Sequence, residues 1–358
     1  MRRREKIVIT GVVLATVGTV LYEIIRQWLQ NRKEYKRLTF DNFDYNKTLG
    51  LAFRNGVVGG LLGYAYYCYR IDNEQTIPFD PDQYLRKILS EEVLKNNPTY
   101  LSQSTSIKNE VKEKLNNAFK DTLISYPQDA GSFAKRTAIA SCYDLDIVLP
   151  FSKQGYGTLE SMYMDVYNVL RDLFGEKATV TKNTKAITLT FEITRGIHID
   201  LDVVPGREIN DFKKDKELNM YVRPGLIWQR GSSFKTNLSQ QLYITRNKPD
   251  ARNIIKLLKR YRAQNNLNIP TIVIEQCVVE ALSEDQFGIQ ISIAENLLNA
   301  MDYLALKLQQ KCLTDFSNSN NNLNDKVSQW NKNYISNLLL ADITKVEKNP
   351  RYLIEIFG

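Results

Sequence analysis

Two short apolar segments of this chain each carry a pair of aspartates at alternate positions. Asp144 and Asp146 lie in YDLDIVLPF, and Asp200 and Asp202 lie in HIDLDVVPG. Residues two apart on a β-strand point to the same face of the sheet, so each pair can present its carboxylates together. Carboxylate oxygens are the hard ligands that Mg²⁺ prefers. The pattern predicts neighbouring strands whose aspartates converge on two divalent cations, as phosphoryl transfer requires.

The segments around these strands have the periodicity of helices and strands. Apolar residues recur at helical spacing from 80 to 121, with a division near Pro98, and again in several segments after Asp250. The stretch from 185 to 193 alternates in the manner of a strand. Helices, then a mixed sheet, then a helical half predict an α+β lobe joined to an α lobe.

The net charge is concentrated near the beginning of the chain. The sequence has 48 Lys and Arg against 40 Asp and Glu, a net charge of +8. Residues 1–70 hold twelve basic and five acidic residues, a net of +7, which leaves +1 for the rest. A body so close to neutral argues against a long basic groove for nucleic acid. The four cysteines form no CxxC pair and His198 is the only histidine, which excludes a structural zinc site.

Two uncharged runs predict a membrane anchor within residues 1–70. One transmembrane candidate covers 7–25, and the other covers 55–69 and contains two overlapping GxxxG spacings. A span usually needs about 20 residues, and both runs fall below that length. One or two transmembrane helices are therefore expected.

A Gly-Ser pair, Gly131 and Ser132, precedes the first two aspartates. A glycine lets the backbone approach a phosphate closely, and the serine hydroxyl and nearby amides can hydrogen-bond it. The order helix, Gly-Ser, Asp-x-Asp, distal Asp resembles the nucleotidyltransferase superfamily that includes DNA polymerase beta.

Longer stretches extend this resemblance. GSFAKRTAIASCYDLDIVLPF resembles the active-site segment of the bacterial cGAS/DncV-like nucleotidyltransferases (CD-NTases) and their oligoadenylate synthase relatives. IDLDVVPG resembles the family's third-carboxylate strand, which selects Asp202 over Asp200. KPDARNIIKLLKRYRAQNNLNIPTIVIEQCVVEAL resembles its nucleotide-contacting helix pair, with Lys259 at the lysine position and Glu275 at the acidic one. DFSNSNNNLND, predicted as a loop, resembles the family's Asp-Pro-Ser-Asn-type loop, with Phe316 in place of proline.

The resemblance implies a domain order and a set of site residues. A membrane anchor at 1–70 is followed by a polymerase-beta-like nucleotidyltransferase lobe at 71–235 and a helical, oligoadenylate-synthase-like lobe at 236–358. Two Mg²⁺ or Mn²⁺ ions are expected at the catalytic, metal-binding residues Asp144, Asp146 and Asp202. Nucleotide is expected to be bound by Gly131, Ser132 and Lys259.

The function that the resemblance implies is synthesis of a cyclic or linear oligonucleotide second messenger from NTPs, with release of pyrophosphate. Expected partners are the NTP substrates, the membrane and an effector in anti-phage (CBASS-type) signalling, with no stable nucleic-acid partner. The expected location is the bacterial inner membrane with the catalytic part in the cytoplasm, where NTP and Mg²⁺ are found. Two alternatives remain: a polymerase or tRNA-type nucleotidyltransferase acting on nucleic acid, and a catalytically silent membrane nucleotide sensor.

Overall fold

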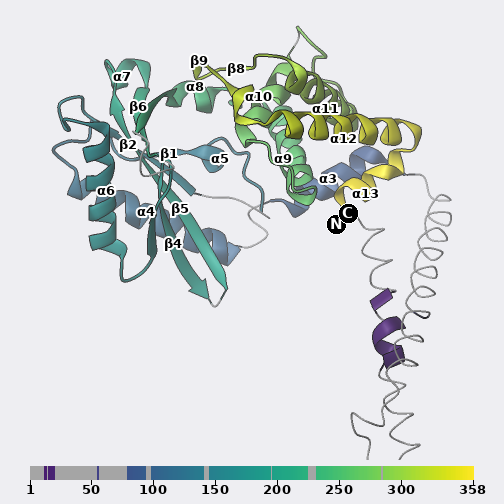
Figure 1. Ribbon diagram of the computed structural model, residues 1–358, viewed down its shortest axis with the longest axis horizontal. Coiled ribbons are helices and arrows are strands. Elements are labelled where there is room, and N and C mark those ends of the chain that lie inside the picture. Colours follow the sequence, from purple (N-terminus) through teal and green to yellow (C-terminus); the bar gives the residue numbers. More distant parts are fainter. Residues whose placement is uncertain are drawn as a thin grey trace, which may run out of the picture. The chain divides into compact units, whose positions relative to one another are not determined.

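The computed structural model describes residues 12–13, 15–20, 55, 79–93, 98–140, 145–194, 196–224, 231–283 and 285–358, without the side chains of 319 and 320. Two compact units make up the chain (Figure 1): Asp82–Ile343 forms one, and Met1–Pro81 with Thr344–Gly358 forms the other. The unit Asp82–Ile343 contains the predicted site residues.

The first half of the described chain contains two helices followed by all strands of the main sheet. Pro98 begins the second helix, as the sequence predicts, because proline fits the first turn of a helix. The elements are α3 (Pro81–Glu91), α4 (Pro98–Ala118), β1 (Gln128–Ala130), α5 (Gly131–Ala134), β2 (Leu145–Phe151), α6 (Leu159–Phe174), β3 (Thr179–Lys182), β4 (Ile187–Thr194), β5 (Ile197–Glu208), α7 (Phe212–Asp215), β6 (Glu217–Val222) and β7 (Ser232–Asn237).

The second half is mainly helical. Its elements are α8 (Leu238–Tyr243), α9 (Pro249–Gln264), α10 (Thr271–Ala281), α11 (Ile293–Gln309), β8 (Thr314–Asp315), β9 (Asn318–Asn322), the 3₁₀ helix η3 (Leu323–Lys326), α12 (Gln329–Lys348), the 3₁₀ helix η4 (Pro350–Tyr352) and α13 (Leu353–Phe357). The Asn-rich segment predicted as a loop instead contains the antiparallel pair β8 and β9.

Among the described residues, the sheet of the larger unit has seven strands. Its order is β1-β2-β5-β4-β3, and β6 pairs with both β5 and β7. β2 and β5 run parallel, whereas the other pairs are antiparallel. β5 is 12 residues long, so its first part can pair with β4 while its end pairs with β6. The mixed sheet agrees with the α+β prediction.

Helices α4 and α6 cover one face of this sheet (Figure 1). Leu145, Ile147 and Leu149 of β2 are buried there in the main core with residues of both helices. Because side chains alternate along a strand, the residues between them point to the opposite face. Val148 does so and packs in a smaller cluster with Phe212. The aspartates of β2 and β5 belong to this second face.

The helical part of the larger unit is organised around α10, whose residues are almost all buried. Helices α9 and α11 pack against it. The N-terminus of α11 is capped by Asp82 of α3, which accepts hydrogen bonds from the Ala294 N–H at 2.9 Å and the Ser292 hydroxyl at 2.8 Å. These bonds satisfy backbone donors that the helix cannot satisfy itself, so α3 is fixed to the helical part.

In the other unit, two contacts lie near the C-terminus. The Lys345 ammonium donates a hydrogen bond to the Tyr352 hydroxyl at 2.7 Å. The Arg351 guanidinium lies 5.5 Å from the centre of the Phe79 ring, within cation–π range. These contacts connect the end of the chain to the residues that precede α3.

The prediction of transmembrane helices is corrected by the structure. Of the candidate spans, 7–25 is described only at 12–13 and 15–20, and 55–69 only at residue 55. Among the helices that are described, none combines the length and the apolar character needed to cross a bilayer. The predicted transmembrane helices and the inner-membrane location are therefore not upheld by the structure, whereas the membrane as a partner stays a prediction. Both runs are shorter than the usual span of about 20 residues.

Candidate functional site

Two of the three predicted catalytic aspartates lie side by side on the sheet. Asp146 of β2 and Asp202 of β5 are register partners in the parallel pair. Both point away from the face covered by α4 and α6, because their neighbours Leu145, Ile147, Leu201 and Val203 are buried in the main core. Asp144 lies outside the described residues. The two carboxylates that can be placed therefore share one partly exposed face.

Asp202 is held by a short chain of hydrogen bonds from β4. The Thr188 hydroxyl donates to Oδ1 of Asp202. The Asn183 side-chain amide donates to the same hydroxyl at 2.6 Å, which leaves the Thr188 hydrogen to point at the carboxylate. Burial, with the nearby Asp200 carboxylate, raises the pKa of Asp202 above its ordinary value, although the bond from Thr188 acts in the opposite direction.

Asp200 occupies a different position on the same face. It is exposed, pairs in register with Thr190 and accepts a hydrogen bond from that hydroxyl at 2.6 Å. Asp202, by contrast, lies opposite Asp146. The register therefore favours Asp202 as the partner of Asp146, which is the choice that the sequence resemblance made.

Gly131 brings its backbone against the Asp146 carboxylate. Its φ of +61° lies in the left-handed region, and a Cβ added there would lie 1.7 Å from Asp146 Oδ2. Only glycine fits both requirements. The chain then enters α5, where the Ser132 carbonyl accepts hydrogen bonds from the N–H groups of Thr137 and Ala138 at 2.9 and 3.1 Å. This close turn is where the sequence predicts a triphosphate.

Lys259 lies in a buried ion-pair network. Its ammonium is 2.9 Å from Oε1 of Glu275, and it donates to the carbonyl and hydroxyl oxygens of Thr137 at 3.2 and 3.1 Å. Lys135 pairs with the other oxygen of Glu275. The side chains of Lys259 and Glu275 are only 7% and 1% exposed. Lys259 thus fixes the turn that follows Gly131 and Ser132, and its predicted contact with nucleotide stays a prediction.

The charges in this network stabilise one another. Burial opposes ionisation of Glu275, but the ammonium groups of Lys135 and Lys259 outweigh burial and hold its pKa below the ordinary value. Burial lowers the pKa of Lys259 despite its pairing with Glu275. The sequence resemblance identified Glu275 and Lys259 by position, but the roles of Lys135 and Thr137 appear only in the folded chain.

A second ion-pair group supports the strand before Gly131. Lys108 and Lys112, one turn apart on α4, contact the two oxygens of Asp129 at 2.9 and 3.1 Å. Burial raises the pKa of Asp129, but the two lysine hydrogen bonds outweigh burial and leave it below its ordinary value. Sequence reasoning missed this group. The helical spacing of the two lysines was the available signal, but nothing in the sequence indicated their partner.

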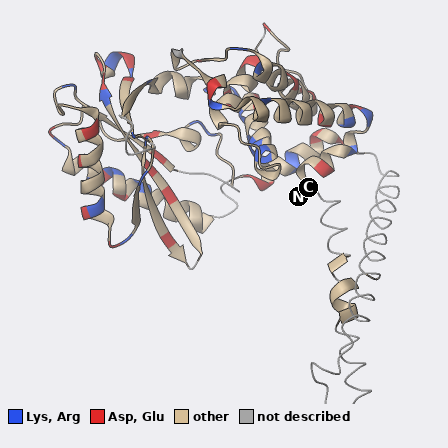
Figure 2. Ribbon diagram, viewed as in Figure 1, with Lys and Arg blue, Asp and Glu red and all other residues tan. Residues whose placement is uncertain are grey.

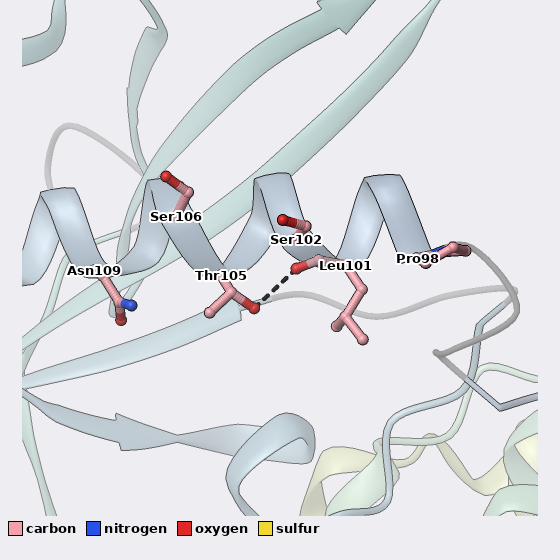
Figure 3. Close-up of a pocket in the computed structure, with 6 residues that line it drawn as sticks. All are labelled: Pro98, Leu101, Ser102, Thr105, Ser106 and Asn109. Carbon is pink, nitrogen blue, oxygen red and sulfur yellow. Dashed lines mark hydrogen bonds between the residues drawn. The ribbon is translucent and has the colours of Figure 1, made fainter.

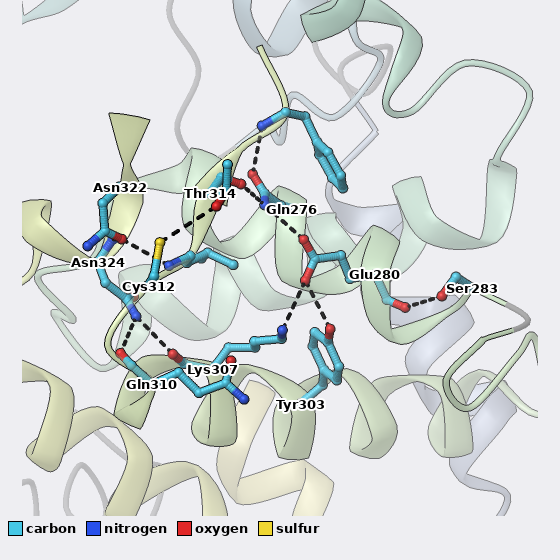
Figure 4. Close-up of polar contacts among 12 residues, drawn as sticks. Gln276, Glu280, Ser283, Tyr303, Lys307, Gln310, Cys312, Thr314, Asn322 and Asn324 are labelled. Carbon is cyan, nitrogen blue, oxygen red and sulfur yellow. Dashed lines mark hydrogen bonds and ion pairs between the residues drawn. The ribbon is translucent and has the colours of Figure 1, made fainter. Parts of the chain in front are cut away.

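Two hollows lie apart from the predicted site residues. One, of about 660 Å³, follows α4 and is lined by Pro98, Leu101, Ser102, Thr105, Ser106 and Asn109 (Figure 3). The other, of about 460 Å³, lies where β8 meets the helical part and includes Glu280, Lys307 and Cys312. Figure 4 shows its polar wall, in which Glu280 accepts hydrogen bonds from Gln276 at 2.8 Å and Tyr303 at 2.9 Å. Such internal pairing is typical of a structural network.

The chemistry of the aspartate pair fits a hard divalent cation. The raised pKa of Asp202 reports negative charge that burial and the neighbouring Asp200 leave poorly compensated, and a cation of the Mg²⁺ type offsets such charge through oxygen ligands. The described residues contain no group of three His, Cys, Asp or Glu side chains placed to hold a metal ion. The third predicted ligand, Asp144, is outside that part of the chain.

No protein-family model matches the sequence, and no curated protein is detectably similar to it. The fold, however, resembles that of the bacterial CD-NTases. CdnG of Bradyrhizobium diazoefficiens, solved with GTP, superposes with a TM-score of 0.60 at 16% identity, covering 78% of this chain and 96% of that chain. CdnC of E. coli MS115-1, solved with HORMA-deltaN, superposes with a TM-score of 0.59 at 18% identity, covering 77% and 96%.

A further structure of E. coli CdnC, solved with ATP, gives a TM-score of 0.57 at 16% identity, covering 77% of this chain and 97% of that chain. The likeness thus extends over nearly all of each neighbour. At this low sequence identity, the structural similarity establishes a shared fold only. Any chemical activity has to be inferred from the residues of this chain.

Proposed function

We propose that this protein is a metal-dependent nucleotidyltransferase that joins NTPs into a short cyclic or linear oligonucleotide and releases pyrophosphate. The observation that carries the proposal is the register pairing of Asp146 with Asp202, beside the close turn at Gly131, within a CD-NTase fold. The solved neighbours that contain GTP or ATP support NTPs as the substrate class.

Each residue of the site has a distinct task in this reaction. Asp146 and Asp202, with Asp144, hold two Mg²⁺ or Mn²⁺ ions, which supply activation of the acceptor hydroxyl and neutralisation of triphosphate charge. Thr188 orients the Asp202 carboxylate. The turn at Gly131 and Ser132 receives the donor triphosphate through its backbone amides and the serine hydroxyl. Alignment of donor and acceptor then contributes much of the rate enhancement.

The network around Glu275 supports this turn. Lys259 and Lys135 contact the two carboxylate oxygens of Glu275, and Lys259 also binds Thr137, five residues after Ser132. The positive charge that remains on this network favours a phosphate group nearby. Lys259 is accordingly proposed to act on the donor phosphates from α9. The product is proposed to act on an effector in anti-phage signalling, as the sequence resemblance implies.

The test is incubation of the purified protein with each NTP, and with all four, in Mg²⁺ or Mn²⁺. Pyrophosphate release and mass spectrometry of the products are the measurements. Short oligonucleotides made without added nucleic acid support the proposal, whereas extension only of an added RNA supports a polymerase-type enzyme. NTP binding without pyrophosphate release under every condition contradicts both activities and leaves a silent nucleotide sensor.

Variants at the aspartates connect the activity to the site. Asp146→Asn and Asp202→Asn are expected to abolish pyrophosphate release, because each removes a charged metal ligand, while thermal unfolding stays cooperative. Asp200→Asn is the matched control, since Asp200 is on the same strand and face but pairs in register with Thr190. Equal loss of activity in all three variants would contradict the assignment of Asp202.

A further inference from the structure

A third hollow, of about 330 Å³, is lined by four cationic side chains and no acidic one. It is formed by the turn after α5, the segment after α8 and the first turns of α9, and Figure 2 shows the basic residues of α9 in blue. Its described lining residues are Ala134, Lys135, Arg136, Leu242, Thr245, Arg246, Asn247 and Arg252. Gly131, Ser132, Asp146 and Asp202 do not line it.

The walls of this basic pocket are fixed by hydrogen bonds between its segments. The Thr245 hydroxyl donates to the Lys135 carbonyl at 3.2 Å, joining the α8–α9 connection to the turn after α5. The Arg252 guanidinium donates to the Thr245 carbonyl at 3.3 Å. Arg136, at a φ of +59°, and Arg246 are exposed. The pocket thus combines a fixed wall with two arginines open to solvent.

Positive charge at the pocket exceeds the negative charge that faces it. Lys135 contacts Glu275, but that single carboxylate is shared with Lys259. Half-buried Lys256, one turn after Arg252, has a lowered pKa because burial, Arg252 and Lys259 all disfavour its charge. A cluster of cations held this close is stabilised by an anion.

The chemistry of the cations indicates which anion fits. Guanidinium groups match the oxygen geometry of phosphate through paired hydrogen bonds, and ammonium groups add a compact charge. The volume falls at the lower end of the range of about 300 to 1,000 Å³ for ligand pockets. It therefore suits a phosphate-rich group of nucleotide size or smaller.

We propose that this pocket binds the phosphate groups of a phosphorylated ligand at a site separate from the aspartate pair. Lys135 belongs both to the pocket and to the network that holds Lys259, so the ligand is bound next to the support of the candidate active site. Phosphate binding here does not depend on the proposed function, since it requires neither the aspartates nor turnover.

The test is isothermal titration of the full chain with sodium pyrophosphate at low ionic strength, where charge screening is weak. EDTA is present throughout, so that binding through metal ions at the aspartates is excluded. The test variant combines Arg136→Asn, chosen because Asn tolerates positive φ, with Arg246→Ala. The matched control combines Lys213→Ala with Lys214→Ala, which removes the same charge from α7, outside the pocket.

We expect the wild type to bind pyrophosphate, and the arginine double variant to bind it at least about tenfold more weakly, as loss of a charge-assisted hydrogen bond predicts. The lysine double variant should remain within about twofold of the wild type. Absence of binding by the wild type to any phosphorylated probe overturns the proposal, as does equal weakening in both double variants, which indicates non-specific attraction.

Two further probes identify the source of the phosphate. ATP reports a free nucleotide ligand, and a short single-stranded oligonucleotide without terminal phosphates reports a phosphodiester backbone. A probe that binds more weakly to the arginine double variant but not to the lysine double variant belongs to the class of ligand that the pocket binds. No step of this test involves NTP turnover. Absence of phosphate binding therefore does not contradict the proposed enzyme activity, and absence of that activity does not contradict phosphate binding by the pocket.

Discussion

The hydroxyl of Thr188 on β4 donates a hydrogen bond to Asp202 on β5, and Thr190, two residues further along the same strand, does the same for Asp200. The two threonine–aspartate pairs thus repeat one geometry on one face of the sheet. Only the first lies in register with Asp146. This repetition supplies an internal control for the role of the first pair.

Thr188→Val is expected to weaken metal binding and turnover by about tenfold or more, a typical effect of losing the group that orients a metal ligand. Mn²⁺ binding by electron paramagnetic resonance and the rate of pyrophosphate release are the measurements. Thr188→Ser should restore most of both, because it keeps the hydroxyl. Thr190→Val should change Mn²⁺ binding and pyrophosphate release by no more than about twofold. A similar loss in both valine variants would show that the substitutions disturb the sheet and do not act through Asp202.

Gly131→Ala is expected to destabilise the fold by more than the roughly 1 to 2 kcal/mol that a left-handed backbone costs a residue with a Cβ, because that Cβ would collide with Asp146. Gly288→Ala separates the two effects, since Gly288 has a similar φ of +66° but no atom within 4 Å of its added Cβ. Urea denaturation of both variants measures the difference. Equal destabilisation of the two variants would mean that the collision of the added Cβ with Asp146 does not contribute to the loss of stability.

Lys259→Met is expected to lower the midpoint of thermal unfolding in the absence of NTP, because it leaves the buried Glu275 with one cation instead of two. Removing one partner of a buried pair typically costs about 3 to 5 kcal/mol. Lys256→Met, one turn earlier on α9, should leave the midpoint unchanged or raise it, since burial and two neighbouring cations already disfavour the charge at Lys256. A rise in the KM for NTP in the Lys259 variant with an unchanged midpoint would assign Lys259 to nucleotide binding alone.

Asp129→Asn is expected to lower stability at neutral pH by an amount that disappears in acid. Lys108 and Lys112 hold the pKa of Asp129 below its ordinary value. The pKa of Asp129 in the folded protein is then below its value of about 3.9 in the unfolded chain. The ionised carboxylate therefore stabilises the fold at pH values above the unfolded pKa. This stabilisation is lost as the pH falls through the folded pKa. Urea midpoints at pH 7, 5 and 3.5 measure this trend, with Asp172→Asn, at a 71% exposed side chain, as the control. A difference that persists unchanged to the lowest pH would contradict it.

The α+β architecture was predictable because it depends on patterns local to the sequence. The alternation around Asp146 and Asp202 places them on strands, and helical spacing and Pro98 locate α4. The β8–β9 pair was missed because Asn and Ser have low strand propensity. Side-chain bonds compensate there: Asp315 accepts hydrogen bonds from the N–H of Ser317 at 2.8 Å and from Asn321 at 2.7 Å.

The strand pattern predicted that Asp146 and Asp202 lie together, but the contacts that support the candidate site could not be predicted. Lys259 was identified by resemblance, but its contacts with Thr137 and Glu275 join residues far apart in the sequence, which periodicity cannot reveal. The same holds for Thr188, whose importance follows from strand register. The membrane anchor was predicted from two uncharged runs, both shorter than the usual span of about 20 residues.

The parallel pairing of β2 with β5 has a consequence for how the protein is made. Parallel strands need a crossover connection, and here it comprises the whole of α6, β3 and β4. A ribosome must therefore synthesise this entire segment before Asp202 can reach Asp146. Contacts of such long sequence separation form slowly. The nascent chain thus cannot pair Asp146 with Asp202 until β5, which pairs with β2, β4 and β6, has emerged, so the candidate site forms late in the synthesis of the sheet.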